Sequence, residues 1–394
     1  MRVATGERRR EEAKKSKELF FAPIYPVLSP QMLLPGRRKA TSQFPFEDPG
    51  VRYFELGRHA MYAFARAWNL ADHEVLFPAY FCGVELDALL AAGARPRFYP
   101  VNNHMQVQVE DVVAGIGRKT RAVIMIHYIG FPGPAAELAE ICRNRGLLLV
   151  EDCAMALLSR RGERPLGSFG DAAIFSIHKT LPIRGGILRL RHDGYSTLPE
   201  HSSPSLISSL AEAASGLDRY FQLHRNGLGS SFVTAIMNSC KLVLRRPGAK
   251  PLRGEQRHFV SHGGRAISRF SRILLANQPL TTIIERRRRN YLHLAKHLRD
   301  VAPPLLGELS LGVCPLFYVF ECVKREAVVR QLRAMGVEAV NFWSKHHPAE
   351  PKAHVPEVVK LRRTVVALPC HQDLSSDAMD EIADHVRTAM DKLS

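Results

Sequence analysis

The stretch AAIFSIHKTLPIRGG, residues 172–186, holds one lysine between an apolar run and a bend that is rich in proline and glycine. The apolar run predicts a short buried strand. In α/β proteins, the residues that follow such strands lie at the sheet edge where ligands bind. A lone lysine at a strand end is usually solvated, so the segments around it decide whether Lys179 is placed to react.

The segments on both sides of this stretch alternate between strand patterns and helix patterns. Strand-like runs are EVLFPAY (74–80), RPRFYPV (95–101), AVIMIHYIG (122–130) and LLLVEDCA (147–154), and helical runs of ordinary length separate them. Short apolar strands that alternate with helices indicate an α/β fold, with a mainly parallel central sheet and helices on both of its faces.

The length of 394 residues predicts more than one domain, because a single core stops growing well below this size. Residues 1–45 mix a charged run with spaced prolines and read as an N-terminal extension with little core of its own. We expect a large α/β domain over residues 46–270, in which the basic segment 196–270 shows no strand pattern. A helix that starts near Leu280 opens a smaller C-terminal α+β domain, residues 271–394.

The formal net charge of +17 makes attraction to anions the expected electrostatic behaviour, without choosing among nucleic acid, membrane surfaces, phosphates and nucleotide-linked substrates. The seven cysteines are scattered and include no Cys-x-x-Cys pair, which argues against a disulfide framework and against a zinc site. No apolar run reaches the roughly 18 residues of a membrane helix. These features predict a soluble, cytoplasmic protein.

Polar side chains collect at the predicted strand ends. Glu151 and Asp152 close one strand, Ser176, His178 and Lys179 follow the next, and His127 follows a third. His127 and His178 are better explained as structural groups than as ligands. A helix start at Gly57, Arg58, His59 and Ala60 offers free N–H donors to an anion. Tyr80 and Phe81 follow a further strand and could form a flat apolar wall.

An anion seat, a carboxylate, a lysine and an aromatic wall are together what pyridoxal 5'-phosphate requires. The phosphate needs N–H and hydroxyl donors, the pyridine nitrogen needs a carboxylate that keeps it protonated, and the aldehyde needs an amine nucleophile. An exposed lysine has a pKa of about 10.4, and desolvation or a nearby cation lowers it toward the working range. The sequence therefore predicts a pyridoxal phosphate site around Lys179.

Five stretches of this sequence resemble motifs of the DegT/DnrJ/EryC1/StrS sugar aminotransferases. These enzymes have the fold type I architecture of pyridoxal phosphate enzymes. The stretches are HEVLFPAYFCGVE, AVIMIHYIGFP, LLLVEDCAMALLS, LGSFGDAAIFSIHKTLP and ALPCHQDL. The resemblance implies a homodimer that transfers an amino group to a keto sugar, expected to be nucleotide-linked, in polysaccharide or natural-product biosynthesis. It assigns Lys179 to the cofactor aldehyde, Asp152 to the pyridine nitrogen, and Ser176 with Gly57–Ala60 to the phosphate. Tyr80 or Phe81 falls near the ring-stacking position.

The chain also departs from the family pattern. Met155 stands where a His or Gln usually contacts the phenolic oxygen of the cofactor, and a thioether is a poor hydrogen-bond partner. Lys179 directly follows His178, two residues earlier than in the common motif. These departures motivate an alternative: a non-catalytic relative that keeps the fold and the dimer.

The run ERRRRN, residues 285–290, invites a nucleic-acid interpretation because clustered arginines bind phosphates. The run lies in a helical pattern with an apolar face, however, so some of its arginines coat the outside of a helix. It also resembles a helix of the same family. The basic segment 245–257 reads as a loop. Neither feature outweighs the aminotransferase hypothesis.

Overall fold

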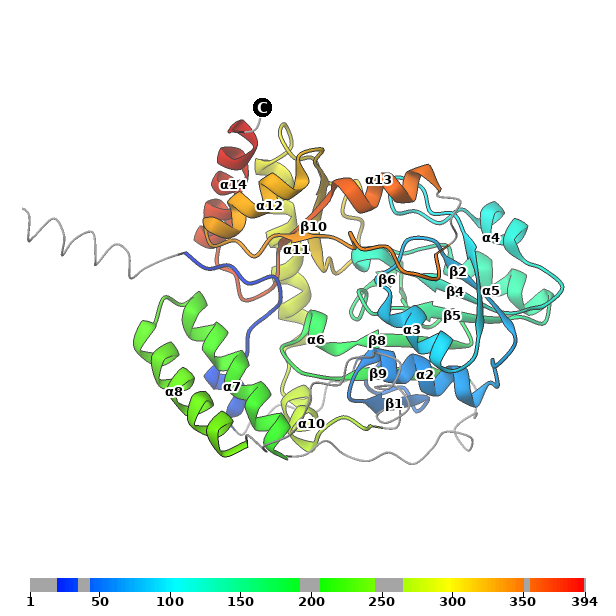
Figure 1. Cartoon of the computed structure of the whole chain (residues 1–394), viewed down its shortest axis with the longest axis horizontal. Coiled ribbons are helices and arrows are strands. Elements are labelled where there is room, and N and C mark those ends of the chain that lie inside the picture. The colour runs from blue at the N-terminus through cyan, green and yellow to red at the C-terminus, as the bar shows by residue number, and fades with distance from the viewer. Residues whose placement is uncertain (1–19, 35–42, 192–205, 245–264, 351–354, 393–394) are drawn as a thin grey trace, which may run out of the picture.

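The structure, a computed structural model, describes residues 20–34, 43–191, 206–244, 265–350 and 355–392. Two bodies are visible in Figure 1, one built on a large sheet and one built on a small sheet at the C-terminal end of the chain. Among the described residues, no helix has the length and apolar character that a membrane span requires.

The large sheet has seven strands in the order β1-β9-β8-β5-β4-β2-β3 within the described residues. The block β3-β2-β4-β5-β8 is parallel throughout, whereas β9 is antiparallel to both of its neighbours, β8 and β1. The prediction of a mainly parallel sheet is confirmed. The strands are β1 (Val51–Phe54), β2 (Glu74–Pro78), β3 (Arg95–Tyr99), β4 (Thr120–Ile126), β5 (Leu148–Asp152), β8 (Ala172–Ser176) and β9 (Gly186–Leu190).

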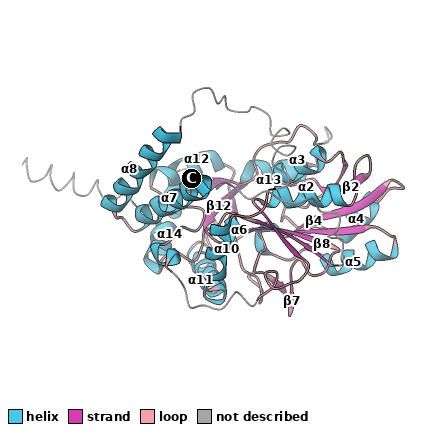
Figure 2. Ribbon diagram, turned by 90° about the horizontal axis from the view of Figure 1, so that it is seen from below, coloured by secondary structure: helices cyan, strands magenta, loops and turns pink. Residues whose placement is uncertain are grey.

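Helices cover both faces of this sheet (Figure 2). The near-continuous burial of β4, β5 and β8 explains why these strands read as uninterrupted apolar runs. The helices of this body are α2 (Gly57–Ala67), α3 (Val84–Ala91), α4 (Val109–Gly115), α5 (Ala135–Asn144) and the short turn α6 (Ile177–Thr180). A 3₁₀ turn, η2 (Tyr128–Gly130), follows β4, and a small hairpin is formed by β6 (Arg160–Arg161) and β7 (Arg164–Pro165).

A glycine on β9 fixes where α2 begins. A Cβ atom on Gly186 would lie 2.2 Å from the carbonyl carbon of Leu56 and 2.3 Å from the nitrogen of Gly57. Only glycine therefore lets the start of α2 lie directly against the sheet. This contact sets the amino end of α2 beside Ser176, the last residue of β8.

The smaller body holds a three-stranded antiparallel sheet in the order β10-β12-β11. A hydrophobic core separate from that of the large sheet packs this small sheet against the helices around it. The elements after residue 265 are α10 (Arg269–Ala276), α11 (Leu280–His297), β10 (Phe317–Glu321), α12 (Arg325–Ala334), β11 (Val340–Asn341), α13 (Pro356–Thr364), β12 (Val365–Pro369) and α14 (Ser376–Asp391). The boundary at residue 271 stays a prediction.

The described part of the N-terminal extension is buried against the C-terminal half of the chain. Ala22 forms a parallel bridge with Val337, and the Val27 amide donates to the carboxylate of Asp373 at 2.9 Å. Seven residues between positions 20 and 28 are buried in this way: Phe20, Ala22, Pro23, Ile24, Pro26, Val27 and Leu28. A short 3₁₀ turn, η1 (Pro30–Leu33), follows.

Two helices occupy much of the segment for which the sequence showed no clear pattern. They are α7 (Leu206–Leu223) and α8 (Gly227–Leu244), and they form a hairpin beside the N-terminal segment (Figure 1). Gly216 of α7 packs against Leu28, where a Cβ would lie 2.8 Å from the Leu28 Cβ. The basic segment 245–257 lies outside the described residues.

Candidate active site

A cavity of about 220 Å³ opens where β5 and β8 end and where α2 and α3 begin. Seven of the residues singled out in the sequence line it together: Gly57, Arg58, Asp152, Met155, Ser176, His178 and Lys179. They come from three separate segments, which the parallel order of the sheet and the crossover helices bring to one edge. The predicted lysine, carboxylate and anion seat thus share one cavity.

Lys179 reaches the cavity from the α6 turn, which follows β8 without a break. Burial alone lowers the pKa of its amine, but interactions with Tyr25, Cys82 and Asp152 raise it by more. The net pKa lies above the ordinary lysine value. Burial acts in the predicted direction, but the acidic groups around the amine outweigh it.

Asp152 is the last residue of β5 and is 5% exposed. One carboxylate oxygen, Oδ1, accepts the Ala154 amide at 2.9 Å. Burial raises the pKa of this carboxyl, and the Ala154 hydrogen bond and the Lys179 amine pull it down by less. A buried carboxylate of this kind gains free energy from a cationic partner in the cavity, such as a protonated ring nitrogen.

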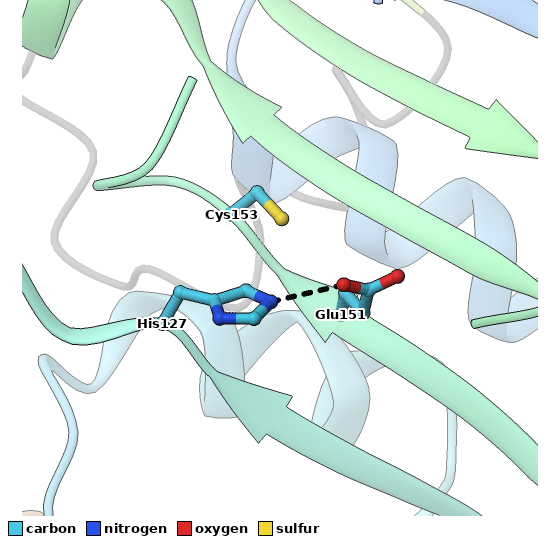
Figure 3. A group of neighbouring side chains, drawn as sticks. All are labelled: His127, Glu151 and Cys153. Atoms are coloured by element: carbon cyan, nitrogen blue, oxygen red, sulfur yellow. Dashed lines mark hydrogen bonds and ion pairs between the residues drawn. The ribbon is translucent and has the colours of Figure 1, made fainter. Parts of the chain in front are cut away.

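Glu151 precedes Asp152 on β5, so its side chain lies on the opposite face of the strand. There it points toward His127 (Figure 3). Its carboxylate accepts amide hydrogens from Gly167, Phe169 and Gly170 at 2.6–2.9 Å and faces His127 Nε2 at 2.9 Å. Burial raises the pKa of Glu151, but the His127 hydrogen bond and the amides lower it by more, so the net pKa is below the ordinary value. The carboxylate holds β5 to the loop that enters β8.

The tautomer of His127 follows from its two neighbours. The Gly133 amide donates to Nδ1 at 2.9 Å, so Nε2 must carry the hydrogen that His127 donates to Glu151. His127, Glu151 and Cys153 lie close enough to suggest a metal site (Figure 3). Because both ring nitrogens and both carboxylate oxygens already have protein partners, the cluster is better described as a hydrogen-bonded support for Asp152.

The anion seat lies between α2 and the end of β8. Ser176 Oγ is 3.0 Å from Nδ1 of His178, and burial together with Lys179 and two arginines lowers the pKa of His178 to about 4. His178 is therefore neutral near pH 7. Gly57 and Arg58 supply the first residues of α2, whose N-terminal cap residue makes no side-chain hydrogen bond to the helix.

Two residues of the predicted helix start are not on the cavity. His59 and Ala60 are fully buried, and the amides of both donate to the carbonyl of Leu56. The turn of the helix carries these side chains into the core, whereas Met61, three residues after Arg58, returns to the cavity wall.

Tyr80 and Phe81 are also absent from the cavity lining. The Tyr80 hydroxyl donates to the Phe342 carbonyl at 3.2 Å, and Phe81 stacks on Phe98 with 5.8 Å between ring centroids. Both rings belong to the core beneath the site. The aromatic surface of the cavity comes instead from Tyr25 and Trp343.

Sequence reasoning also missed Cys82 and Glu85, although both lie in the quoted motif HEVLFPAYFCGVE. The Cys82 amide donates to Oε1 of Glu85 at 2.8 Å. Burial, and then the charge of Asp152, raise the pKa of Glu85 to about 7. Met155, the departure noted in the sequence, lines the same cavity.

A buried arginine, Arg287, fixes the Lys179 turn by hydrogen bonds to its backbone. Arg287 of α11 is 1% exposed, and its guanidinium donates to the Thr180 carbonyl at 3.0 Å and to the Gln372 amide oxygen at 2.8 Å. Gln372 donates to the same Thr180 carbonyl at 3.2 Å. Further donation to the carbonyl of Leu316 at 3.1 Å ties the turn to the strand β10. The sequence suggested that some arginines of this run coat the outside of the helix, but this one is internal.

The fold combines the large sheet with its antiparallel strand β9, the Lys179 turn after β8 and the small C-terminal sheet. Solved structures of aminotransferases share this fold. PseC of Helicobacter pylori, involved in the biosynthesis of pseudoaminic acid, matches 95% of this chain and 100% of its own at 16% identity, with a TM-score of 0.67. TlmJ of Streptoalloteichus hindustanus matches 88% of this chain and 87% of its own at 21% identity, with a TM-score of 0.63.

Residues 57–188, about a third of the chain, match the model of the DegT/DnrJ/EryC1/StrS aminotransferase family. A curated relative is the dTDP-4-dehydro-2,3,6-trideoxy-D-glucose 4-aminotransferase of Saccharopolyspora spinosa. It is 32% identical over 128 residues, which are 32% of this chain and 33% of the relative. The match to this relative thus spans about a third of its length.

Proposed function

We propose that the chain is a pyridoxal phosphate-dependent aminotransferase that acts on a keto sugar. One observation carries the proposal: Lys179 and Asp152 line one cavity together with Ser176 and the start of α2. A lysine amine, a buried carboxylate and a hydroxyl beside a helix N-terminus are the groups that this cofactor needs. The family match over the same residues supports the proposal.

The donor set fits the cofactor. Lys179 would bind the aldehyde, Asp152 would face the ring nitrogen, and Ser176 with Gly57 and Arg58 would hold the phosphate. The cavity contains no second lysine in the described part of the chain, so the aldehyde has one candidate partner. When bound, the cofactor supplies an electron-withdrawing ring that stabilises negative charge on the carbon next to the transferred amino group.

The residues of the chain then have separate tasks. Lys179 takes up and returns a proton at its Nζ atom, and its surroundings favour the protonated form. The neutral imidazole of His178 orients the Ser176 hydroxyl. Tyr25 and Trp343, which come from opposite ends of the chain, enclose the cavity and limit the access of water.

The substrate part of the proposal comes from the relatives. A second curated relative, the dTDP-3-amino-3,4,6-trideoxy-alpha-D-glucose transaminase of Micromonospora megalomicea subsp. nigra, is 24% identical over 80% of this chain and 78% of its own. The net charge of +17 suits a substrate with a diphosphate. We infer a nucleotide-linked keto sugar, and we infer a homodimer by analogy with the family.

The test is amino transfer by the purified protein. We expect protein with added cofactor to absorb in the visible to near-ultraviolet and to lose that band with an amino donor such as L-glutamate. The band should return when a dTDP-linked 4-keto sugar is added. Lys179→Ala should abolish the band and the transfer, while Lys119→Ala, at an exposed lysine before β4, should leave both unchanged.

The same experiment separates the aminotransferase from the non-catalytic alternative. A protein that binds the cofactor at Lys179 but never converts it with any amino donor would support the alternative, for which Met155 in the cavity is the motivating feature. Conversion by a donor would exclude it.

A further inference from the structure

Two histidines stand one turn apart on α11, away from the active-site cavity. His293 and His297 are four residues apart and therefore lie on one face of the helix. Their rings stack with 4.4 Å between centroids and an interplanar angle of 19°. Two imidazoles at this spacing are a recurrent way for a helix to present two nitrogen ligands to one ion.

A carboxylate from another helix completes the group. Asp380 of α14 places Oδ1 2.9 Å from Nε2 of His293. The Nε2 atom is shielded from solvent, yet its contact with Asp380 lacks the geometry of a hydrogen bond. A shielded nitrogen that has no hydrogen-bond partner and lies 2.9 Å from a carboxylate oxygen can coordinate the same cation as that oxygen.

The neighbouring contacts show how the two helices lie. Asn290 bonds to the carbonyl of Leu374, just before α14, and Arg387 bonds to the carbonyl of His297. The helices therefore run in the same direction at this contact. Asp384 follows Asp380 by one helical turn and so stands at the level of His297. Its carboxylate is not among the ligand atoms that lie within 4.8 Å of one another, so its side chain would have to rotate to reach the ion.

The distances within the cluster fit a small metal ion. One ligand atom from each of His293, His297 and Asp380 lies within 4.8 Å of the other two, and His293 Nε2 is 2.9 Å from Asp380 Oδ1. Tetrahedral Zn²⁺ with ligand bonds of about 2.0–2.2 Å needs ligand atoms about 3.4 Å apart. The observed range includes this value, so rotation of the exposed side chains is enough to close the site.

We propose that His293, His297 and Asp380 form a binding site for a divalent transition metal, best suited to Zn²⁺. Two imidazole nitrogens and one carboxylate oxygen favour Zn²⁺ over Mg²⁺ and Ca²⁺, which prefer all-oxygen sites. Water or Asp384 completes the coordination. The ion joins α11 to α14 within the small body, and this site is independent of the proposed transamination.

The experiment is calorimetric titration of Zn²⁺ and, separately, of Mg²⁺ into the full chain without a histidine tag. We expect saturable Zn²⁺ binding with one ion per chain and no Mg²⁺ binding. At a hundredfold excess over Kd, Zn²⁺ should raise the melting temperature by about 3 °C. His293→Gln and His297→Gln should each weaken binding by at least about tenfold, and Asp380→Asn should weaken it as well. His73→Gln, at an exposed histidine near β2, serves as the control.

The outcomes are distinct. If the cluster is only an ion pair, Asp380→Asn lowers the melting temperature without any dependence on Zn²⁺, and the proposal is wrong. Zn²⁺ binding that persists in both histidine variants would place the ion elsewhere in the chain and would also overturn the proposal. Loss of amino transfer does not bear on either result, because the titration reads metal binding directly.

Discussion

Asp152 and Lys179 reach one cavity from the ends of two adjacent parallel strands, β5 and β8. Asp152 ends its strand, and Lys179 stands three residues after the end of the other. Parallel pairing brings both ends to the same sheet edge, so the two groups can face a common ligand although 26 residues separate them in the chain.

Asp152→Asn should keep the fold and reduce amino transfer. Asparagine preserves the shape and can still accept the Ala154 amide, but it cannot hold a proton on the ring nitrogen by charge. We expect the rate of the first half-reaction to fall by about 10²–10⁴-fold. Stopped-flow absorbance with L-glutamate measures it, and an unchanged rate would remove Asp152 from the proposed chemistry.

Arg287→Lys should disturb the Lys179 turn, because an ammonium cannot reproduce the bonds to both Thr180 and Gln372. We expect a loss of about 2–4 kcal/mol in the free energy of unfolding and slower attachment of the cofactor to Lys179. Urea denaturation and the time course of the absorbance band measure the two effects. Arg289→Lys, at an exposed position of the same helix, should change stability by less than about 0.5 kcal/mol.

If Arg287→Lys lost stability but attached the cofactor at the normal rate, the arginine would be a packing residue only. A positioning role requires both effects.

Glu151→Gln should remove an acid-sensitive part of the stability. The folded pKa of Glu151 is below its unfolded value, so its contribution is present above the unfolded pKa of about 4.3 and is lost as the pH falls through the folded pKa. The wild type should be more stable than the variant at pH 7. The difference in their free energies of unfolding should become smaller below about pH 4. Melting temperatures across this range test it, and a constant gap would contradict it.

Glu85→Gln should have the opposite pH dependence. The pKa of Glu85 is raised to about 7, so folding is disfavoured progressively as the pH rises from the unfolded pKa toward 7. Glutamine keeps an acceptor for the Cys82 amide without the charge. The variant should therefore exceed the wild type by up to about 3 kcal/mol above pH 7 and by little at pH 4. Denaturation at both pH values measures this, and a less stable variant at pH 8 would refute it.

Gly186→Ala should prevent α2 from starting against the sheet, because its Cβ would overlap the backbone at Leu56. We expect a loss of about 3 kcal/mol or more, together with weaker binding of inorganic phosphate. Gly227→Ala, where a Cβ would meet nothing within 4 Å, is the matched control and should be neutral. Equal stability of the two variants would contradict the account of the helix start.

The sequence predicted the sheet because its strands are buried on both faces and therefore appear as apolar runs. Lys179, Asp152 and Ser176 could be found because each follows a strand directly. Tyr25 and Trp343 could not, because they come from segments more than 300 residues apart that meet only in the folded chain. The local pattern also did not show which aromatic ring after β2 would face the cavity. In the structure, the rings of Tyr80 and Phe81 are both buried in the core.

Arg287 was missed for a different reason. A run of four arginines is normally solvated, and burial of one of them depends on carbonyl acceptors from β10 and from the Lys179 turn that only the tertiary structure supplies. The helices α7 and α8 were missed because their serines and glycines interrupt the helical pattern.

The most direct test of the account is reduction of the cofactor-loaded protein with borohydride, followed by mapping of the labelled peptide. We expect a single cofactor-modified residue, Lys179, and no label in Lys179→Ala. A label on any other lysine, or none at all in protein that carries out amino transfer, would contradict it.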